Sequence, residues 1–359
     1  MANAPLGNEK LTELLAELTR RGASDLLLVG GTEAAVRLNG EVEKIGDHPL
    51  AGPEIEELIA GVLSPAAAEQ YRNAQIADSS YRIPGLGRFR INLHRERGKA
   101  AATIRALPVK VPALDELGLP TEVANLAGFR RGLVLIGGAA GAGKSTTLAA
   151  LVNEINKRDA RHILTIEDPV EYEHQHLRSV IEQVEVGTDA PDFPTALRAA
   201  LRQAPDVLVV GEMRDPESMA IAVSAAETGH LVLSTLHTTD VASAVSRIAD
   251  SFPAERQNTI RQELSMAVSA ILSQTLLPSR KGGRVPALEM LMIGYGARQH
   301  IRRNALQHLH QEITMTKGKG SITLEESLAR LVRQGHLERD EAAEFAVHPD
   351  DLKSLLRKA

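Results

Sequence analysis

The stretch Leu133–Ser145, which reads LVLIGGAAGAGKS, determines the fold class of this chain. Its first four residues are apolar and predict a buried strand, whereas Gly138–Ser145 matches the phosphate-binding pattern GxxxxGKS in full. After the loop, apolar side chains recur at helical spacing, at Leu148, Leu151, Val152 and Ile155. Strand, glycine-rich loop and helix in this order predict a nucleotide site on an α/β sheet, and they disfavour an ordinary glycine-rich turn.

Each part of this loop has an expected chemical task. Glycines let backbone N–H groups close around phosphate oxygens, and the N-terminus of the following helix adds a favourable partial charge. We expect Lys144 to reach the β- and γ-phosphates of ATP and the Ser145 hydroxyl to bind Mg²⁺. The residues expected to hold the nucleotide are Gly138, Gly141, Gly143, Lys144, Ser145 and Thr146.

The composition limits the class of protein. Of the 359 residues, 43% are hydrophobic and 24% are charged, which is typical of a soluble chain long enough for two domains. The net charge of -5 gives no general attraction for nucleic acid or for an anionic membrane. There is no cysteine, so disulfides, thiolate zinc sites and thiol catalysis are excluded. No signal peptide or membrane-spanning run is visible, so we expect a cytoplasmic protein that reaches a membrane only through a partner.

Residues 1–107 mix helix and strand signals and predict an α+β domain. Three short strands are expected in it, at Asp25–Val29, Ala34–Leu38 and Gly85–Leu93. The second strand leads to a predicted turn at Asn39-Gly40. Arg88 and Arg90 share one face of the third strand, because alternate strand residues point to the same side. Residues 108–131 contain three prolines and predict a linker, at Pro108, Pro112 and Pro120.

Residues 132–359 predict a nucleotide-binding domain, in which the pattern of apolar residues differs from that of residues 1–107. Apolar runs separated by helices are found at Leu133–Ile136, Ile163–Ile166, Val207–Val210, Leu231–Ser234 and Leu288–Ile293. Continuous apolar strands that alternate with helices indicate a mostly parallel sheet covered on both faces. From about Gln257 onward we expect the chain to be mostly helical.

Carboxylates follow two of the predicted strands. Glu212 comes after Val207–Val210, at the strand end where open α/β sheets bind their ligands. The usual residue there is Asp, and Glu212 is suited to holding Mg²⁺ through water or to orienting the nucleophile. Glu167, Asp168 and Glu171 follow Ile163–Ile166, and spacing alone does not say which of them acts. Solvated strand ends are the alternative for both sets.

Two histidines bracket a third strand. His230 precedes Leu231–Ser234 and His237 follows it, with Thr235, Thr238 and Thr239 nearby. Polar side chains at the end of a third adjacent strand would lie where a γ-phosphate sensor belongs. A histidine at a strand edge is also often a hydrogen-bonded structural residue, and both interpretations stay open.

Four ordered segments resemble the secretion and pilus ATPases of the PilT/PilB/GspE family. They correspond to the family's Walker A, Asp box, Walker B and His box, and they read GAAGAGKS (Gly138–Ser145), ILTIEDPVEY (Ile163–Tyr172), LRQAPDVLVVGEMRD (Leu201–Asp215) and AAETGHLVLSTLHTT (Ala225–Thr239). Asp25-Leu26 and Arg37–Gly40 are similar to the family's PAS-like N-terminal domain. Gly87–Asn92 is similar to its arginine-bearing strand. The resemblance covers most of the chain.

The resemblance implies a PAS-like domain before a RecA-like P-loop domain with a helical C-terminal part, assembled as a homo-hexamer with ATP between subunits. It implies Glu171 as the general base, Glu212 as the Walker B acid, and His237 as the γ-phosphate sensor supported by His230. Arginines of the N-terminal domain contact phosphates in the family, and the candidates here are Arg88, Arg90, Arg95, Arg97 and Arg105. An arginine set against transition-state charge is worth about three orders of magnitude in rate.

Compactness, the absence of cysteine and the wording GEMRD at Gly211–Asp215 resemble the retraction branch of the family. Two segments depart from that branch. Ala297–Asn304 reads ARQHIRRN where retraction ATPases carry AIRNLIRE, and the acidic residue usual before Pro205-Asp206 is replaced. We therefore expect an ATP-hydrolysing motor subunit for type IV pilus retraction, acting with an inner-membrane platform protein and a possible partner ATPase.

Other functions stay open at this stage. An accessory retraction paralogue fits, as does a type II secretion or pilus assembly ATPase. A DNA-moving ring ATPase fits less well, since no basic patch interleaved with aromatic residues suggests direct nucleic-acid contact. A nucleotide-binding partner with little hydrolysis is disfavoured by the presence of Lys144, Glu171 and Glu212.

Overall fold

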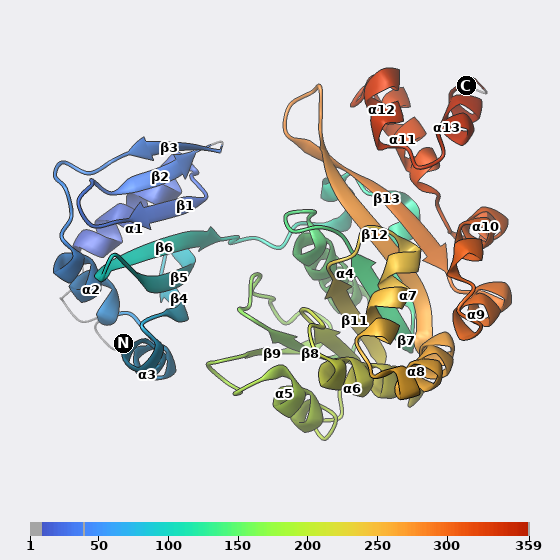
Figure 1. Cartoon of the computed structure of the whole chain (residues 1–359), viewed down its shortest axis with the longest axis horizontal. Helices are drawn as coiled ribbons and strands as arrows, with labels where there is room; N and C mark the ends of the chain where they lie inside the picture. The colour runs from blue at the N-terminus through green and yellow to red at the C-terminus, as the bar shows by residue number, and fades with distance from the viewer. Residues whose placement is uncertain (1–8, 39, 358–359) are drawn as a thin grey trace. The chain divides into compact units, whose positions relative to one another are not determined.

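The computed structural model describes residues 9–38 and 40–357, which form two compact units. The first unit reaches Lys110 and also includes the short segments Asp168–Glu173 and Glu185–Asp189. The second unit contains the rest of the described chain, including the phosphate loop. Figure 1 colours both units by position in the sequence.

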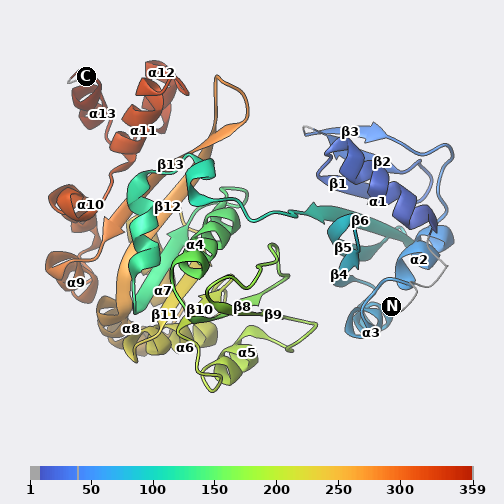
Figure 2. The same ribbon diagram turned by 180° about the vertical axis from the view of Figure 1, so that it is seen from behind.

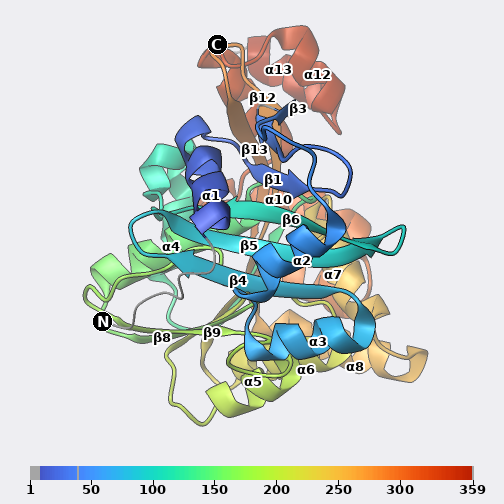
Figure 3. The same cartoon turned by 90° about the vertical axis from the view of Figure 1, so that its left-hand side faces the viewer.

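The first unit is an antiparallel sheet packed against helices. Its six strands have the order β3-β2-β1-β6-β5-β4. The strands are β1 (Asp25–Leu28), β2 (Ala35–Leu38), β3 (Glu41–Lys44), β4 (Ala77–Ile83), β5 (Gly87–Glu96) and β6 (Lys99–Leu107), and the helices are α1 (Glu9–Arg21), α2 (Gly52–Ala60) and α3 (Pro65–Ala74). Figure 3 faces this sheet. The three predicted strands are present as β1, β2 and β5, whereas Asn39 of the predicted turn lies outside the described residues.

Alternation along β5 separates the two faces of this sheet. Phe89, Ile91 and Leu93 are fully buried in a core shared with α1, α2 and α3. The residues between them point to the opposite face, as strand periodicity requires, and these include Arg88 and Arg90. One face therefore carries the core and the other carries arginines.

The predicted linker contains structure of its own. Two short 3-10 helices, η1 (Leu114–Leu117) and η2 (Thr121–Gly128), lie between Pro112 and the first strand of the second unit. Val123, Leu126 and Ala127 of η2 are fully buried in the core of that unit. The C-terminal half of the predicted linker is therefore part of the nucleotide-binding unit.

A seven-stranded sheet forms the centre of the second unit, in the order β13-β12-β7-β11-β10-β8-β9. Its strands are β7 (Gly132–Gly137), β8 (His162–Glu167), β9 (Val180–Glu185), β10 (Val207–Val210), β11 (Leu231–Leu236), β12 (Val268–Pro278) and β13 (Arg284–Met292). β7, β8, β10 and β11 run parallel to their neighbours in this group, and β12 pairs parallel to β7 and antiparallel to β13. The expected mixed α/β class with a mostly parallel sheet is confirmed.

Helices cover both faces of this sheet, as the continuous apolar strands require. α4 (Lys144–Arg158) packs against β7, β11 and η2 on one face, visible in Figure 2. α6 (Pro216–Glu227) packs against β7 and β11, and α7 (Val241–Asp250) packs against β7, β12 and β13. α5 (Phe193–Ala200) and α8 (Ala254–Ala267) pack against α6. The predicted apolar face of α4 is confirmed, because Leu148, Leu151, Val152 and Ile155 are all buried.

The C-terminal third is only partly as expected. The prediction of mostly helical structure from about Gln257 is wrong for β12 and the first part of β13, the long hairpin that Figure 1 shows in orange, whereas the apolar run Leu288–Ile293 is confirmed as part of β13. α8 ends at Ala267 and β12 starts at Val268, so no turn residue marks the change from helix to strand. Helices then dominate as expected: α9 (Tyr295–Arg302), α10 (Leu309–Met315), α11 (Leu324–Arg333), α12 (Arg339–Phe345) and α13 (Pro349–Arg357).

Across residues 9–38 and 40–357, no helix combines the length and the apolar composition needed to cross a bilayer.

If η2 is part of the second unit's core, then Leu126→Ala should destabilise that unit. The side chain is fully buried, so its truncation should lower the free energy of unfolding by about 2–5 kcal/mol. Chemical denaturation followed by circular dichroism measures the change, with the exposed neighbour Thr121→Ala as the control. Equal stability of Leu126→Ala and the wild type would show that η2 only connects the two units and does not contribute to the core of the second unit.

Candidate nucleotide site

The functional side chains gather at one edge of the second unit's sheet. Because β7, β8, β10 and β11 are parallel, their carboxyl ends lie at the same edge. The phosphate loop follows β7, and Glu167 ends β8. Glu212 follows β10 and His237 follows β11. The structure thus brings these four predicted features of the second unit to one edge.

The phosphate loop is shaped by three glycines with positive φ. Gly138, Gly141 and Gly143 have φ values of 153°, 76° and 85°, and α4 begins directly after the third. A Cβ atom on Gly138 would lie 2.5 Å from the backbone oxygen of Gln274. Backbone conformation and close approach to β12 therefore both require glycine at the first position.

Lys144 is held by its own loop. Its side chain is buried, with Nζ donating to the carbonyl oxygens of Gly138 at 2.8 Å and Ala139 at 2.9 Å. Both acceptors lie in the backbone that is expected to surround the phosphates. Phosphate oxygens form stronger, charge-assisted hydrogen bonds with an ammonium group than neutral carbonyls do. The ammonium group is thus positioned to exchange carbonyl partners for a nucleotide. Ser145 and Thr146 occupy the next positions of α4.

Glu212 and His237 are in contact. The distance between Glu212 Oε1 and His237 Nε2 is 3.2 Å, and Glu212 Oε2 lies 2.9 Å from the guanidinium of Arg214. The ends of β10 and β11 are also joined by a hydrogen bond from Thr235 Oγ1 to the Gly211 carbonyl, at 2.6 Å. Two residues predicted from separate strands therefore form one polar pair.

Thr238 contributes a buried hydroxyl at the base of the loop. It is 8% exposed, and its Oγ1 has no hydrogen-bond partner in the described part of the chain. A Cβ atom on Gly137 would lie 2.6 Å from this oxygen, which places the hydroxyl against the first residues of the phosphate loop. A buried hydroxyl without a partner costs about 1–3 kcal/mol, so a water or a nucleotide oxygen bound there would recover that energy.

The structure does not bring His230 to this site. The residue precedes β11, its carbonyl accepts from Gly132 N at the start of β7, and its Nδ1 lies 3.0 Å from the Ala225 carbonyl. Residues seven positions apart along an extended strand are separated by roughly 23 Å. His230 thus lies at the amino-terminal edge of the sheet, where it lines a 210 Å³ cavity with Arg130 and Arg161, and direct support of His237 by His230 is excluded in this structure.

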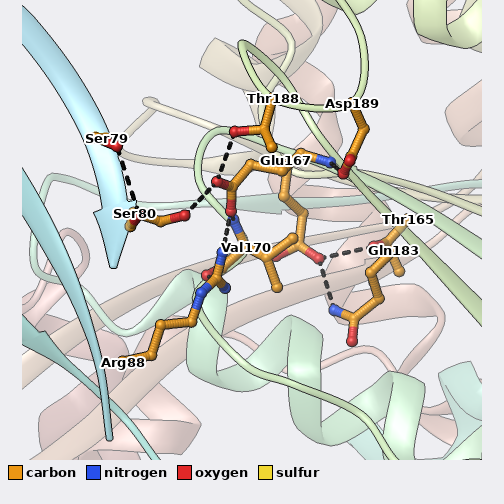
Figure 4. A network of polar contacts seen from close by, with 10 residues as sticks. Ser79, Ser80, Arg88, Thr165, Glu167, Val170, Gln183, Thr188 and Asp189 are labelled. Carbon is orange, nitrogen blue, oxygen red and sulfur yellow. Dashed lines mark hydrogen bonds and ion pairs between the residues drawn. The ribbon is translucent and has the colours of Figure 1, made fainter. Parts of the chain in front are cut away.

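Glu167 is oriented by two neighbours (Figure 4). Thr165 Oγ1 donates to Glu167 Oε1 at 2.8 Å, and Gln183 Nε2 donates to the same oxygen at 3.2 Å. Gln183 in turn accepts from the backbone N–H of His174 at 2.8 Å. Burial lowers the pKa of His174 to about 4, so this ring is neutral at pH 7. Glu171, the expected base, is half-buried in the segment Asp168–Glu173 that groups with the first unit.

Within the first unit, Glu185 is the centre of a buried polar network, and Figure 4 labels its partners Ser80, Arg88 and Val170. Its carboxylate accepts from Ser80 Oγ at 2.6 Å and from the backbone N–H of Val170 at 3.1 Å, and it pairs with Arg88. Arg88 also donates to the Val170 carbonyl. The Arg88 guanidinium is thus engaged by the loop that contains Glu171.

The other four candidate arginines divide into two groups. Arg90 and Arg105 are directly opposite each other on β5 and β6 and share the face away from the core, with Asp78 at 3.3 Å and Asp25 at 2.8 Å as partners. Arg95 points to the other face, where it pairs with Glu56 at 2.9 Å and covers the ring of Tyr71. Arg97 lies in the turn between β5 and β6 and pairs with Glu96.

Several positioning residues were missed from the sequence. Gln274 of β12 contacts both the phosphate loop and Thr147 of α4. Gln274 lies within a short polar stretch, Ser273–Thr275, between two apolar pairs, and the expectation of helix in this region hid its role. Gln183 carries no local signal, because its role depends on contacts between strands, whereas Thr238 was among the threonines expected near His237.

Known proteins resemble the chain along its whole length. A family model described as type II/IV secretion system protein matches residues 89–344. The type IV pilus retraction ATPase PilT of Pseudomonas aeruginosa is 39% identical over 341 residues, covering 95% of this chain and 99% of that protein. The type IV pilus ATPase PilU of the same species is 36% identical over 350 residues, covering 97% and 91%.

A solved structure agrees with this result. The crystal structure of the pilus retraction motor PilT with bound ADP superposes with a TM-score of 0.86 at 39% sequence identity, covering 96% of this chain and 98% of that one. The resemblance inferred from the four sequence segments is therefore confirmed. The chain belongs to the type II/IV secretion system protein family and is a PilT-like member of it.

Proposed function

We propose that this chain is an ATP-hydrolysing motor subunit that drives type IV pilus retraction. The contact between Glu212 and His237 carries the proposal, because both side chains lie at the sheet edge that holds the phosphate loop, and a carboxylate and an imidazole there suit a Walker B acid and a γ-phosphate sensor. Similarity along the whole chain to proteins named for pilus retraction supports the biological role.

Each residue has a defined task in this proposal. Lys144 leaves the carbonyls of Gly138 and Ala139 and donates to the β- and γ-phosphates. The hydroxyl of Ser145 and the carboxylate of Glu212, partly through water, are oxygen donors of the kind that Mg²⁺ prefers. Bound Mg²⁺ neutralises charge on the β- and γ-phosphates. His237 contacts the γ-phosphate. Because His237 also contacts Glu212, the presence of the γ-phosphate changes the surroundings of Glu212.

The general base is one of two carboxylates. We assign the role to Glu171, and Glu167 is the alternative. Glu167 lies in the same unit as the phosphate loop and is oriented by Thr165 and Gln183, which is what a residue that aligns water requires. Arg88 engages the backbone next to Glu171, so it acts in this proposal by positioning the loop of the base. This leaves Arg90 and Arg105 as the phosphate-contacting candidates on the open face.

The motor is proposed to act as a homo-hexamer in the cytoplasm, held at the inner membrane by a platform protein. The proposed docking surface is centred on Arg302 and Arg303 and includes the exposed side chain of Met266. The guanidinium of Arg302 contacts the sulfur of Met266. A positively charged surface of this kind fits an acidic loop of the platform or of a partner ATPase.

Arg298 has a different role from its neighbours in the segment Ala297–Asn304. Its guanidinium donates to the carbonyls of Ser265 and Met266, the latter at 2.8 Å, at the C-terminal end of α8. Burial lowers the pKa of Arg298, which nonetheless stays charged at neutral pH. Arg298 therefore stabilises the join of α8 and α9, whereas Arg302 and Arg303 are available to a partner.

An accessory role beside another retraction ATPase is the second candidate function. Its support is the similarity to PilU, which covers 97% of the chain at 36% identity, whereas the similarity to PilT covers 95% at 39% identity. Deleting the gene in a host that retains its other retraction ATPase separates the two. A motor predicts loss of twitching, and an accessory subunit predicts weakened retraction force with twitching retained.

Substitutions at Lys144 and Glu171 test the chemistry. Lys144→Ala should abolish hydrolysis and weaken ATP binding, because it removes the charge that faces the phosphates. Glu171→Gln should keep ATP binding and lower kcat by about a hundredfold to ten-thousandfold, the usual range for loss of a general base. Phosphate release and nucleotide-binding assays measure both. Turnover near that of the wild type in Glu171→Gln would transfer the role to Glu167, whose Gln variant is the matched comparison.

Protein concentration tests the assembly. If arginines of the first unit complete a neighbouring subunit's site, turnover per subunit should rise with concentration as rings form. Phosphate release measured across a dilution series, with the oligomeric state followed by light scattering, checks this expectation. A verified monomer with full activity would contradict it.

Charge reversal tests the docking surface. Arg302→Glu with Arg303→Glu should leave the ATPase rate and ring size unchanged and abolish retraction in cells, because like charges oppose encounter with an acidic partner. Twitching motility and ATPase rate are measured on the same variant. Arg339→Glu with Lys353→Glu, at exposed positions of α12 and α13, is the matched control. Normal twitching in the first variant would remove the docking role.

A further inference from the structure

Gln274 is a polar residue buried inside an apolar strand. It is 3% exposed and lies on β12, the neighbour of the strand that leads into the phosphate loop. Its Nε2 donates to the carbonyl of Ala142 at 2.7 Å, and its Oε1 accepts from Thr147 Oγ1 at 2.8 Å. One side chain thus joins β12 to the loop and to the first turn of α4.

The two bonds allow only one orientation of the amide. A carbonyl such as that of Ala142 accepts and needs a donor, whereas the Thr147 hydroxyl in this geometry donates and needs an acceptor. Rotating the amide by 180° would set two oxygens against each other. Thr147 is itself almost fully buried, so water cannot replace the lost bonds without a change in packing.

The bond to Ala142 fixes the direction of a neighbouring donor. In a planar trans peptide the C=O and the following N–H point in opposite directions. Holding the Ala142 carbonyl toward Gln274 therefore turns the N–H of Gly143 away from β12, toward the interior of the phosphate loop. A phosphate loop binds its anion with such inward-pointing N–H groups.

Two glycines of the phosphate loop also lie very close to Gln274. A Cβ atom on Gly143 would lie 2.9 Å from Gln274 Nε2, and one on Gly138 would lie 2.5 Å from the Gln274 carbonyl oxygen. The first and last glycines of the loop thus both pack against Gln274. Apart from the chain neighbours of each glycine, Gln274 is the residue that lies nearest to both of these Cβ positions in the described chain.

We propose that Gln274 is a positioning residue that sets the phosphate loop in its nucleotide-binding conformation by anchoring the Ala142 carbonyl and Thr147. The inference deepens the proposed function, since it concerns the same site. It concerns nucleotide binding, so it is tested independently of hydrolysis and of pilus retraction.

The test is Gln274→Glu in the full chain, with ADP as the probe. The variant keeps the size of the side chain but sets a carboxylate oxygen against the Ala142 carbonyl, near the place where phosphates bind. ADP affinity should fall by about tenfold or more, the loss expected when a buried acceptor faces an anion in place of its donor. KM for ATP should rise with it. The increase in melting temperature caused by saturating ADP should shrink relative to that of the wild type.

Gln257→Glu is the matched control. Gln257 also donates its amide to a backbone carbonyl, that of Phe252 at 3.2 Å, but it lies on α8 away from the loop. It should lower stability at most, leaving ADP affinity unchanged. A purely structural role for Gln274 would lower the melting temperature of the free protein and leave ADP affinity equal to that of the wild type. That result overturns the proposal.

Thr147→Val keeps the test decisive if Gln274→Glu does not fold. It removes only the second anchor of the amide and keeps the shape of the side chain. ADP affinity should then fall by about threefold or more, in line with loss of one neutral hydrogen bond. Wild-type affinity in a folded Thr147→Val would overturn the proposal. Failure of the wild type to hydrolyse ATP, with ADP binding lost in Gln274→Glu, would reject the proposed function and leave this inference supported.

Discussion

The site depends on one constraint: the phosphate-loop backbone must pass very close to β12 while its N–H groups point the other way. Gly138 and Gly143 leave no room for a side chain at the points of closest approach. The positive φ angles at both positions also favour glycine, so the lack of space and the backbone conformation both require glycine there. The side chain of Lys144 then folds back over the loop, and its ammonium group donates hydrogen bonds to two backbone carbonyls.

The parallel sheet extends this constraint to the catalytic groups. Its strands end at one edge, and short hydrogen bonds such as that from Thr235 to Gly211 hold neighbouring ends together. Glu212 and His237 meet there because β10 and β11 are adjacent and in register. Side chains that follow two separate strands therefore meet at one point of this edge. In the first unit, the open arginine face of the sheet remains separate from the core face that carries α1, α2 and α3.

Local patterns made much of this predictable. The phosphate loop, the apolar strands and the carboxylates after them are each contained in a few consecutive residues. The α/β class is therefore confirmed, and Lys144, Glu212 and His237 lie at the sheet edge where the sequence predicts them. β12 did not follow, because α8 runs into it at Ala267 without a glycine or proline to mark the change. Missing β12 meant missing Gln274. The supporting role expected for His230 came from the family resemblance. The structure does not bring His230 to His237, because the extended strand β11 lies between them.

We propose that this protein hydrolyses ATP with residues at this edge of the sheet, and that it does so in a motor that does not act on nucleic acid. The most direct measurement is phosphate release from ATP by the purified chain as Mg²⁺ is increased, with and without single-stranded DNA. The account predicts Mg²⁺-dependent turnover that single-stranded DNA does not change. Absence of turnover at any Mg²⁺ concentration, or turnover that needs DNA, would contradict it.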